Sequence, residues 1–331
     1  SGLTPQQADL PAVLRLKGMA QLQSGDYANA MHALRKLTEK QPGSIEGWFQ
    51  LARAQAAAGA RAASRASFER AIELDQGHKV PVVWIGLAEL ELRDRRYDEA
   101  LELAQRIKTH FPGNVAGHDV EAAAYRGKGD IEQALAAAES ALRMDANSRR
   151  VNAFARSLAA AGQMDRGLGV LQEWLGNNPD DGAAWANLGM LRQQAGQEDA
   201  ALQAYEQVLQ HGEASAVILN NMAWLYLERD GARAVELATR AYELAPSRAE
   251  IVDTYGWVLF KQGRARDGLA ALQQASIIAP RNAEISLHVA EALHSLNRDS
   301  EARPILERIL REHPNSEFEE SARELLDQLR G

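Results

Sequence analysis

The chain has 331 residues, a formal net charge of −8 and no cysteine, so disulfide bonds, thiolate metal sites and a cysteine nucleophile are excluded. The acidity lies in the second half: residues 1–150 contain 20 Lys and Arg against 19 Asp and Glu, whereas residues 151–331 contain 17 against 26. This balance disfavours general DNA or RNA binding, which needs a basic face, and no apolar run of 18 or more residues is present to span a membrane.

Small residues recur about every 34 residues along the chain, a period typical of stacked helix–turn–helix units. One series lies at the predicted midpoint of a first helix: Gly18, Ala52, Ala88, Ala122, Ala155, Gly189, Ala223, Gly256 and Ala290. A second series lies where a second helix would cross the first: Ala30, Ser64, Ala100, Ala134, Gly167, Ala201, Ala234, Gly268 and Ala302. Small side chains at each crossing let the two helices approach closely. The pattern therefore predicts an all-α solenoid.

In chain order, residues 1–10 are predicted to be a lead-in too short for a cap helix, so we expect further repeats upstream of Ser1. Nine repeats follow, at residues 11–44, 45–78, 81–114, 115–147, 148–181, 182–215, 216–248, 249–282 and 283–316. Residues 317–331 are predicted to form a capping helix, because a solenoid needs a polar-backed terminal helix to cover its last stacking face. The apolar stripe of that helix is Phe318, Ala322, Leu325, Leu326 and Leu329.

Glycine and proline mark the ends of the predicted helices. Turn glycines, where a left-handed backbone costs little, are Gly25, Gly59, Gly129, Gly162, Gly196 and Gly263. Prolines that end the second helix of a unit are Pro42, Pro112, Pro179, Pro246, Pro280 and Pro314. The second, fourth and sixth units lack this proline and have Gln76, Ala146 and Glu213 there. Pro304 falls near the start of the last unit's second helix, where we expect a shifted start or a kink.

In these positions the chain resembles the tetratricopeptide repeat family, in which a large residue, Leu, a small residue, Gly, Ala and Pro recur at the same offsets. The resemblance covers residues 11–316, and it implies a right-handed superhelix of about nine repeats whose first helices line a concave groove. It implies a non-enzymatic scaffold that binds a protein or peptide in that groove, with no cofactor and no metal. The set of Lys, Asn and Arg residues with which one subgroup of the family grips chaperone C-termini is not present in three consecutive units.

In the family, certain positions of the first helix face the concave groove. At the matching positions of units five to eight, three features of this sequence predict a binding groove. Asn187 and Asn221 share one offset, with Asn152 and Asn220 close by, and amides can hold an extended peptide backbone. The alternative is that these amides cap or bridge neighbouring helices.

The second feature is aromatic: Met190, Trp224 and Trp257 share another offset and Phe260 follows, which predicts an exposed strip unless each Trp packs as core. The third is Arg149 and Arg156, a possible basic spot that solvated surface Arg would equally explain. Asp253 and Thr254 complete the predicted groove.

The closing repeats are similar to those of long bacterial tetratricopeptide repeat lipoproteins that accompany exopolysaccharide export and PEP-CTERM protein sorting. The similarity lies in strings such as Asn220-Asn221-Met222-Ala223-Trp224-Leu225 and His288-Val289-Ala290-Glu291-Ala292-Leu293. It implies a periplasmic scaffold with a lipid anchor upstream of Ser1, and a cytoplasmic location is the alternative. Two other functions remain open: a polysaccharide-binding solenoid, and the regulatory array of a larger enzyme such as a glycosyltransferase.

Overall fold

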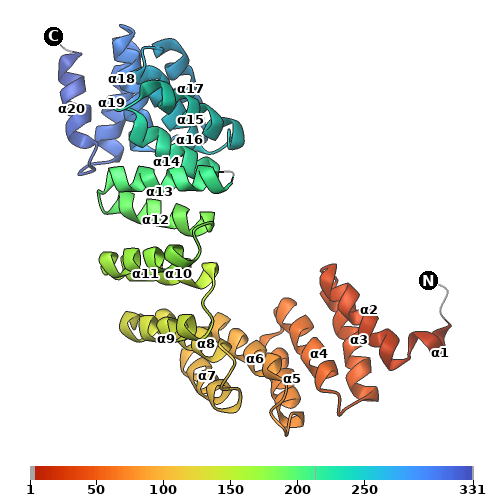
Figure 1. The fold of residues 1–331 in the computed structure, drawn as a ribbon. Helices are drawn as coiled ribbons and strands as arrows, with labels where there is room; N and C mark the ends of the chain where they lie inside the picture. Colours follow the sequence, from red (N-terminus) through yellow and green to blue (C-terminus); the bar gives the residue numbers. More distant parts are fainter. Residues whose placement is uncertain (1–3, 213, 330–331) are drawn as a thin grey trace. The chain divides into compact units, whose positions relative to one another are not determined.

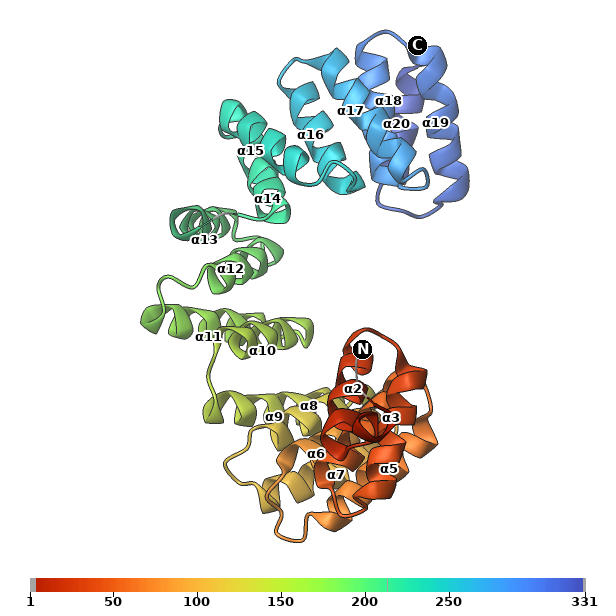
Figure 2. The same cartoon turned by 90° about the vertical axis from the view of Figure 1, so that its right-hand side faces the viewer.

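The computed structural model describes residues 4–212 and 214–329, and within them it contains twenty α-helices and no strand. The predicted start at Ser1, Glu213 of the sixth unit, and the last two residues of the predicted capping helix lie outside this range. Successive helices lie side by side as antiparallel pairs (Figures 1 and 2). This arrangement confirms the all-α fold class.

The helices are regular in length and spacing. The bounds are α1 Pro5–Ala8, α2 Pro11–Gln23, α3 Tyr27–Lys40, α4 Ile45–Ala57, α5 Arg61–Leu74, α6 Pro81–Arg93, α7 Tyr97–His110, α8 Ala116–Lys128, α9 Ile131–Met144, α10 Ser148–Ala160, α11 Met164–Asn177, α12 Gly182–Gln194, α13 Glu198–His211, α14 Ala216–Tyr226, α15 Gly231–Leu244, α16 Ala249–Lys261, α17 Ala265–Ile278, α18 Ala283–Ser295, α19 Asp299–Glu312 and α20 Glu319–Gln328. The predicted lead-in thus contains one four-residue helix, and the helix predicted from residue 317 begins at Glu319.

The turns inside the helix pairs confirm the glycine prediction. All six predicted turn glycines have positive φ, between 72° and 80°. At two turns without glycine, Arg95 and Asn297 adopt the same left-handed backbone with φ of 59° and 57°. Eight of the nine helix pairs therefore share the left-handed turn, the described turn between α14 and α15 being the exception, and glycine is the residue that adopts it at least cost.

The ends of the second helices do not depend on proline. Each of the six predicted prolines stands two residues after a helix ends, but α5 and α9 end at the same point without one. After α5, Asp75 is 3% exposed and its carboxylate accepts hydrogen bonds from the backbone N–H groups of Lys79 and Val80 at 2.9 and 3.1 Å. Pro304 lies inside α19, whose start at Asp299 is not shifted relative to the neighbouring pair.

At two of the predicted crossing points the helices of a pair are in direct contact. In α16 and α17 the backbones of Gly256 and Gly268 meet: a Cβ on Gly268 would lie 2.7 Å from the carbonyl oxygen of Gly256. In the second repeat the crossing residue is Ser64, whose buried hydroxyl donates to the carbonyl oxygen of Ala52 at 2.8 Å.

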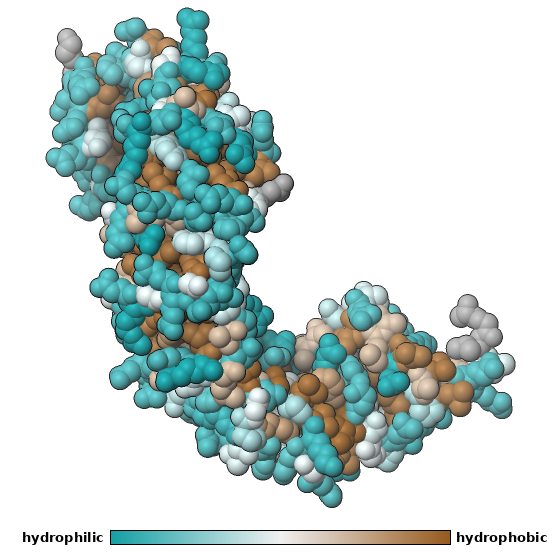
Figure 3. Space-filling view, in the orientation of Figure 1, coloured by the Kyte–Doolittle hydropathy of each residue, from teal (hydrophilic) through white to brown (hydrophobic). Residues whose placement is uncertain are grey.

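The chain divides into two compact units, which we call the N-terminal unit (Ser1–Gly167) and the C-terminal unit (Leu168–Gly331). Each has its own apolar core, built from the facing stripes of its helices. Ala322, Leu325 and Leu326 of α20 belong to the core of the C-terminal unit. On the face drawn in Figure 3, hydrophilic side chains predominate and apolar ones appear as separate patches between them.

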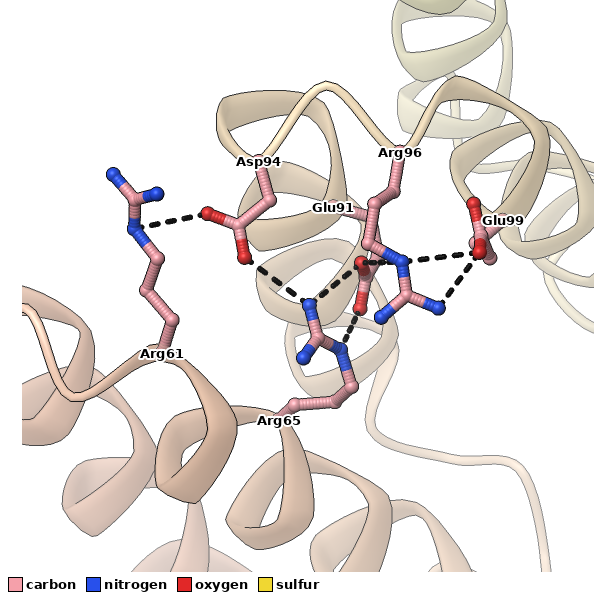
Figure 4. Close-up of polar contacts among 6 residues, drawn as sticks. All are labelled: Arg61, Arg65, Glu91, Asp94, Arg96 and Glu99. Carbon is pink, nitrogen blue, oxygen red and sulfur yellow. Dashed lines mark hydrogen bonds and ion pairs between the residues drawn. The ribbon is translucent and has the colours of Figure 1, made fainter.

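A chain of ion pairs joins three helices of the N-terminal unit (Figure 4). Arg65 on α5 donates to both carboxylate oxygens of Glu91 on α6, at 2.5 and 3.0 Å, and to Asp94 at 3.1 Å. Glu91 is 3% exposed and also pairs with Arg96, the residue immediately before α7. The hydrogen bond with Glu91 raises the pKa of the Arg65 guanidinium. These bonds connect consecutive repeats and compensate for the burial of the Glu91 carboxylate.

No helix among the described residues combines the length and apolar character needed to cross a membrane.

Candidate partner-binding surface

The first helices of consecutive pairs in the C-terminal unit form one polar hollow of about 210 Å³. Its lining comes from α12, α14, α16, α18 and the residue before α18: Gln193, Asn220, Asn221, Trp224, Glu250, Asp253, Thr254, Asn282, Glu284 and Ile285. Five of the predicted groove residues therefore come together here: Asn220, Asn221, Trp224, Asp253 and Thr254.

The charge of this hollow is negative. Glu250, Asp253 and Glu284 contribute carboxylates, and no Lys or Arg lines it. Desolvation raises the pKa of the Glu284 carboxyl, and the negative charge of Asp253 acts in the same direction against the opposite effect of His288. Asp253 is paired with His288, but no Lys or Arg among the described residues of the lining offsets Glu250 and Glu284, so the hollow favours a cationic group from another molecule.

The predicted amide ladder is only partly available to a ligand. Asn187 is 2% exposed and therefore lies in the core of the unit. Asn221 donates from Nδ2 to the Tyr205 hydroxyl at 3.2 Å, and that hydroxyl donates to Oε1 of Gln193 at 2.8 Å. Burial raises the pKa of Tyr205, which is fully buried. The amide of Asn221 thus bridges neighbouring helices, the alternative that the sequence left open.

Asn220 differs from these two amides. Its Oδ1 atom is buried beside the hollow and accepts no hydrogen bond from the residues that the structure describes. A buried acceptor without a donor is unfavourable, but this atom is closed to solvent, so a ligand reaches it only if the Asn220 side chain moves.

Below the hollow, a buried cluster fixes the position of Asp253. The Nδ1 atom of His288 lies 3.0 Å from both carboxylate oxygens of Asp253, and the His288 ring stacks on Trp257 with centroids 4.0 Å apart. Phe260 adds a second ring at 5.3 Å from Trp257, and the Lys261 ammonium lies 5.4 Å from the indole centroid. Stacked rings and a paired carboxylate hold this part of the surface rigid.

A second hollow of about 360 Å³ lies on the other side of Trp224. Its lining is Glu198, Trp224, Leu225, Leu227, Glu228, Arg229, Trp257, Lys261 and His288. Trp224 is 41% exposed and borders both hollows, whereas Trp257 is only 8% exposed. The prediction of an exposed aromatic strip is therefore wrong for Trp257, because His288 covers its ring.

The remaining predicted residues lie elsewhere. Met190 and Phe260 are half-buried and pack against the core of the C-terminal unit. Arg149 and Arg156 are exposed on α10, which belongs to the N-terminal unit. Asn152, also on α10, is 6% exposed and donates to the backbone carbonyl of Ser148 at 2.8 Å. A groove role for these five residues stays a prediction.

Sequence reasoning missed several lining residues for which a signal existed. Glu250 and Glu284 are one period of 34 residues apart, so they occupy the same position in consecutive repeats. His288 follows Asp253 by 35 residues, the spacing of neighbours across two stacked first helices. Reading charge at fixed repeat positions would have identified the acidic hollow.

Antiparallel helix pairs at a constant spacing, with an exposed surface on the first helices, define a helical repeat scaffold. The chain matches the tetratricopeptide repeat family over residues 21–80, 125–190 and 259–329, and a second tetratricopeptide repeat description over residues 182–210. These matches cover more than half of the chain, which therefore belongs to the tetratricopeptide repeat family. Proteins of this family typically bind proteins or peptides.

Solved structures of similar fold share little sequence with the chain. The whole chain aligns with 65% of a chain in the APC/C hetero-tetramer Cut9-Hcn1 at 16% identity and a TM-score of 0.56. The C-terminal part of a TPR repeat-containing protein from Cytophaga hutchinsonii aligns over 73% of this chain and 99% of its own, at 16% identity and a TM-score of 0.54. A tetratricopeptide repeat protein from Parabacteroides merdae aligns over 76% and 99%, at 16% identity and 0.52. No curated protein matches the sequence.

Proposed function

We propose that the chain is a protein–protein interaction scaffold whose C-terminal unit binds a basic, extended segment of a partner protein across Trp224. The observation that carries the proposal is the exposed indole of Trp224 beside a hollow where, among the described residues, Glu250 and Glu284 have no Lys or Arg near them in the lining and the third carboxylate, Asp253, is paired with His288. A guanidinium or ammonium group in this hollow would meet opposite charge, and Trp224 at its edge offers an aromatic face for a cation–π contact.

Binding of a defined peptide tests this function. We expect a fluorescein-labelled nine-residue peptide with alternating Arg and Ser to bind the protein in fluorescence anisotropy, and the same peptide with Glu in place of Arg not to bind. Trp224→Ala should weaken binding about tenfold, the usual effect of removing an aromatic anchor. Glu250→Lys combined with Glu284→Lys should weaken it at least as much.

A matched control separates the local charge of the hollow from the net charge of the protein. Glu243→Lys combined with Glu307→Lys makes the same change in net charge at exposed positions outside the hollow. If the control pair weakens the Arg peptide as much as Glu250→Lys with Glu284→Lys, or if Trp224→Ala binds it unchanged, the proposed site is wrong.

A second candidate is a polysaccharide ligand, because an exposed Trp beside carboxylate and amide groups also suits a sugar ring. Glycan oligomers titrated against the difference in Trp fluorescence between the protein and its Trp224→Ala variant distinguish the two functions. A saturable change with oligosaccharide and none with the Arg peptide would favour the sugar.

The pathway is a finer proposal. A role in bacterial exopolysaccharide export or envelope assembly, with a periplasmic location and an upstream lipid anchor, is supported by the resemblance of the closing repeats. The coding sequence upstream of Ser1 tests it: a signal peptide followed by a lipidated cysteine is expected, and a direct cytoplasmic start would contradict it.

A further inference from the structure

The N-terminal unit has a separate hollow of about 310 Å³ on the first helices of its second and third pairs. Residues on one face of α4 and one face of α6 line it, together with Phe68 of α5: Phe49, Arg53, Ala56, Ala57, Phe68, Val82, Ile85, Gly86, Glu89 and Arg93. Counted from Phe49 on α4, the lining residues follow at four, seven and eight residues, and counted from Val82 on α6 at three, four, seven and eleven, which places the side chains on a single helical face. None of these residues belongs to the predicted groove.

The floor of this hollow is apolar and depends on Gly86. A Cβ at Gly86 would lie 2.6 Å from the Phe68 ring, so the absence of a side chain at Gly86 leaves room for that ring to pack beneath α4 and α6. Phe49 meets Phe68 edge to face with ring centroids 6.1 Å apart. Val82 is 48% exposed at the rim. Phe68 is itself 3% exposed and supports the floor from below, so the surface offers the half-buried Phe49 ring and the exposed Val82 side chain to an incoming apolar group.

The rim is basic. Arg53 lies with its guanidinium carbon 5.7 Å from the Phe49 ring centroid and donates to Gln50, and Arg93 is exposed at the other end of the hollow. Within residues 4–212 and 214–329 neither guanidinium forms an ion pair, and Glu89 is the single carboxylate in the lining. Two unpaired guanidinium groups at the edge of an apolar floor are complementary to a bulky apolar side chain flanked by carboxylates.

We propose that this hollow is a second docking site, which binds a partner segment with an aromatic or large aliphatic residue between Asp or Glu residues. The apolar side chain packs on Phe49 and Val82, and the flanking carboxylates pair with Arg53 and Arg93. The ligand has the opposite charge to the one proposed for the C-terminal unit. This site therefore goes beyond the proposed function and is independent of it.

Three nine-residue fluorescein-labelled peptides test the site by anisotropy on the full chain. The first has a central Phe flanked by Asp, the second replaces that Phe with Ala, and the third replaces the Asp residues with Lys. We expect the first to bind and the second to bind more than about tenfold more weakly, since burial of a Phe side chain contributes most of the apolar term. The third should not bind, and salt should weaken binding of the first.

Single charge reversals locate the binding. Arg53→Glu and Arg93→Glu should each weaken the first peptide about fivefold, the effect of losing one partly exposed ion pair. Arg35→Glu on α3 is the matched control, because Arg35 is exposed, lies outside the hollow and gives the same change in net charge. Val82→Ser should also weaken binding, and circular dichroism checks that each variant keeps its helices.

The two proposed sites can be tested independently of each other. Glu250→Lys with Glu284→Lys should abolish binding of the Arg peptide and leave the Phe–Asp peptide unaffected. The proposal is overturned if the Phe–Asp peptide does not bind, if its Ala or Lys version binds equally well, or if Arg53→Glu and Arg93→Glu behave like Arg35→Glu.

Discussion

Replacing Gly268 with alanine tests whether the small residues of the repeat are required by helix contact. A Cβ on Gly268 would lie 2.7 Å from the Gly256 carbonyl oxygen, 2.8 Å from the Phe260 backbone nitrogen and 2.9 Å from the Phe260 Cβ. The shortest of these is about 0.7 Å inside ordinary van der Waals contact. Two of the three atoms belong to the backbone of α16 and cannot rotate away, so α16 and α17 must separate.

Overpacking of this kind costs about 3 kcal/mol at the upper end of its usual range. The better helix propensity of alanine returns about 1 kcal/mol. The free energy of unfolding should therefore fall by about 2 kcal/mol. Urea unfolding followed by circular dichroism at 222 nm measures the change, and hydrogen exchange of residues 249–282 locates it.

Gly169→Ala is the matched control, because Gly169 also lies inside a second helix and its Cβ would meet no atom within 4 Å. This control should raise the free energy of unfolding by up to about 1 kcal/mol through helix propensity alone. If Gly268→Ala is as stable as Gly169→Ala, close backbone contact is not the reason for glycine at the crossing.

Two further predictions concern buried carboxylates. Glu91→Gln should lower the free energy of unfolding by about 2 kcal/mol in urea titrations, because the neutral amide loses charge-assisted hydrogen bonds to Arg65 and Arg96; a change below about 0.5 kcal/mol would contradict the structural role of the network. Burial raises the pKa of Glu291, against smaller opposite effects of His288 and Lys261, so the folded state binds its proton more tightly than the unfolded state does. As the pH rises from the pKa of Glu291 in the unfolded state through its raised pKa in the folded state, the contribution of Glu291 to stability therefore falls. Glu291→Gln should be more stable than the parent protein at pH 7 and lose that advantage near pH 4; an unchanged difference across this range would refute the assignment.

The period of the sequence was sufficient to predict the fold. The turn glycines and crossing residues could be read from it because each satisfies a purely local requirement, a left-handed turn or a close helix contact. Those requirements repeat in most of the units, and the turn between α14 and α15, which has no left-handed residue, is an exception. The site could be predicted only in part, because whether a side chain is exposed depends on which residue the next repeat places against it.

Trp224 and Trp257 illustrate this dependence. Both stand ninth in their predicted repeats, yet their exposed fractions are 41% and 8%. His288, which stacks on Trp257, is the sixth residue of the repeat that follows Trp257. The sixth residue of the repeat that follows Trp224 is the small Thr254. Thr254 lines the same hollow as Trp224 and leaves its indole uncovered.

The same comparison explains how a uniform repeat produces unlike surfaces. At the two positions compared, the large His288 at the sixth position covers the ring at the ninth, and the small Thr254 leaves it exposed. In the N-terminal unit Gly86 is the sixth residue of the third repeat, and the hollow above Phe68 opens at that point. The size of the residue at the sixth position therefore contributes to which side chains these first helices expose, while charges at other positions on the same helices, such as Glu250 and Arg53, decide what the hollows attract.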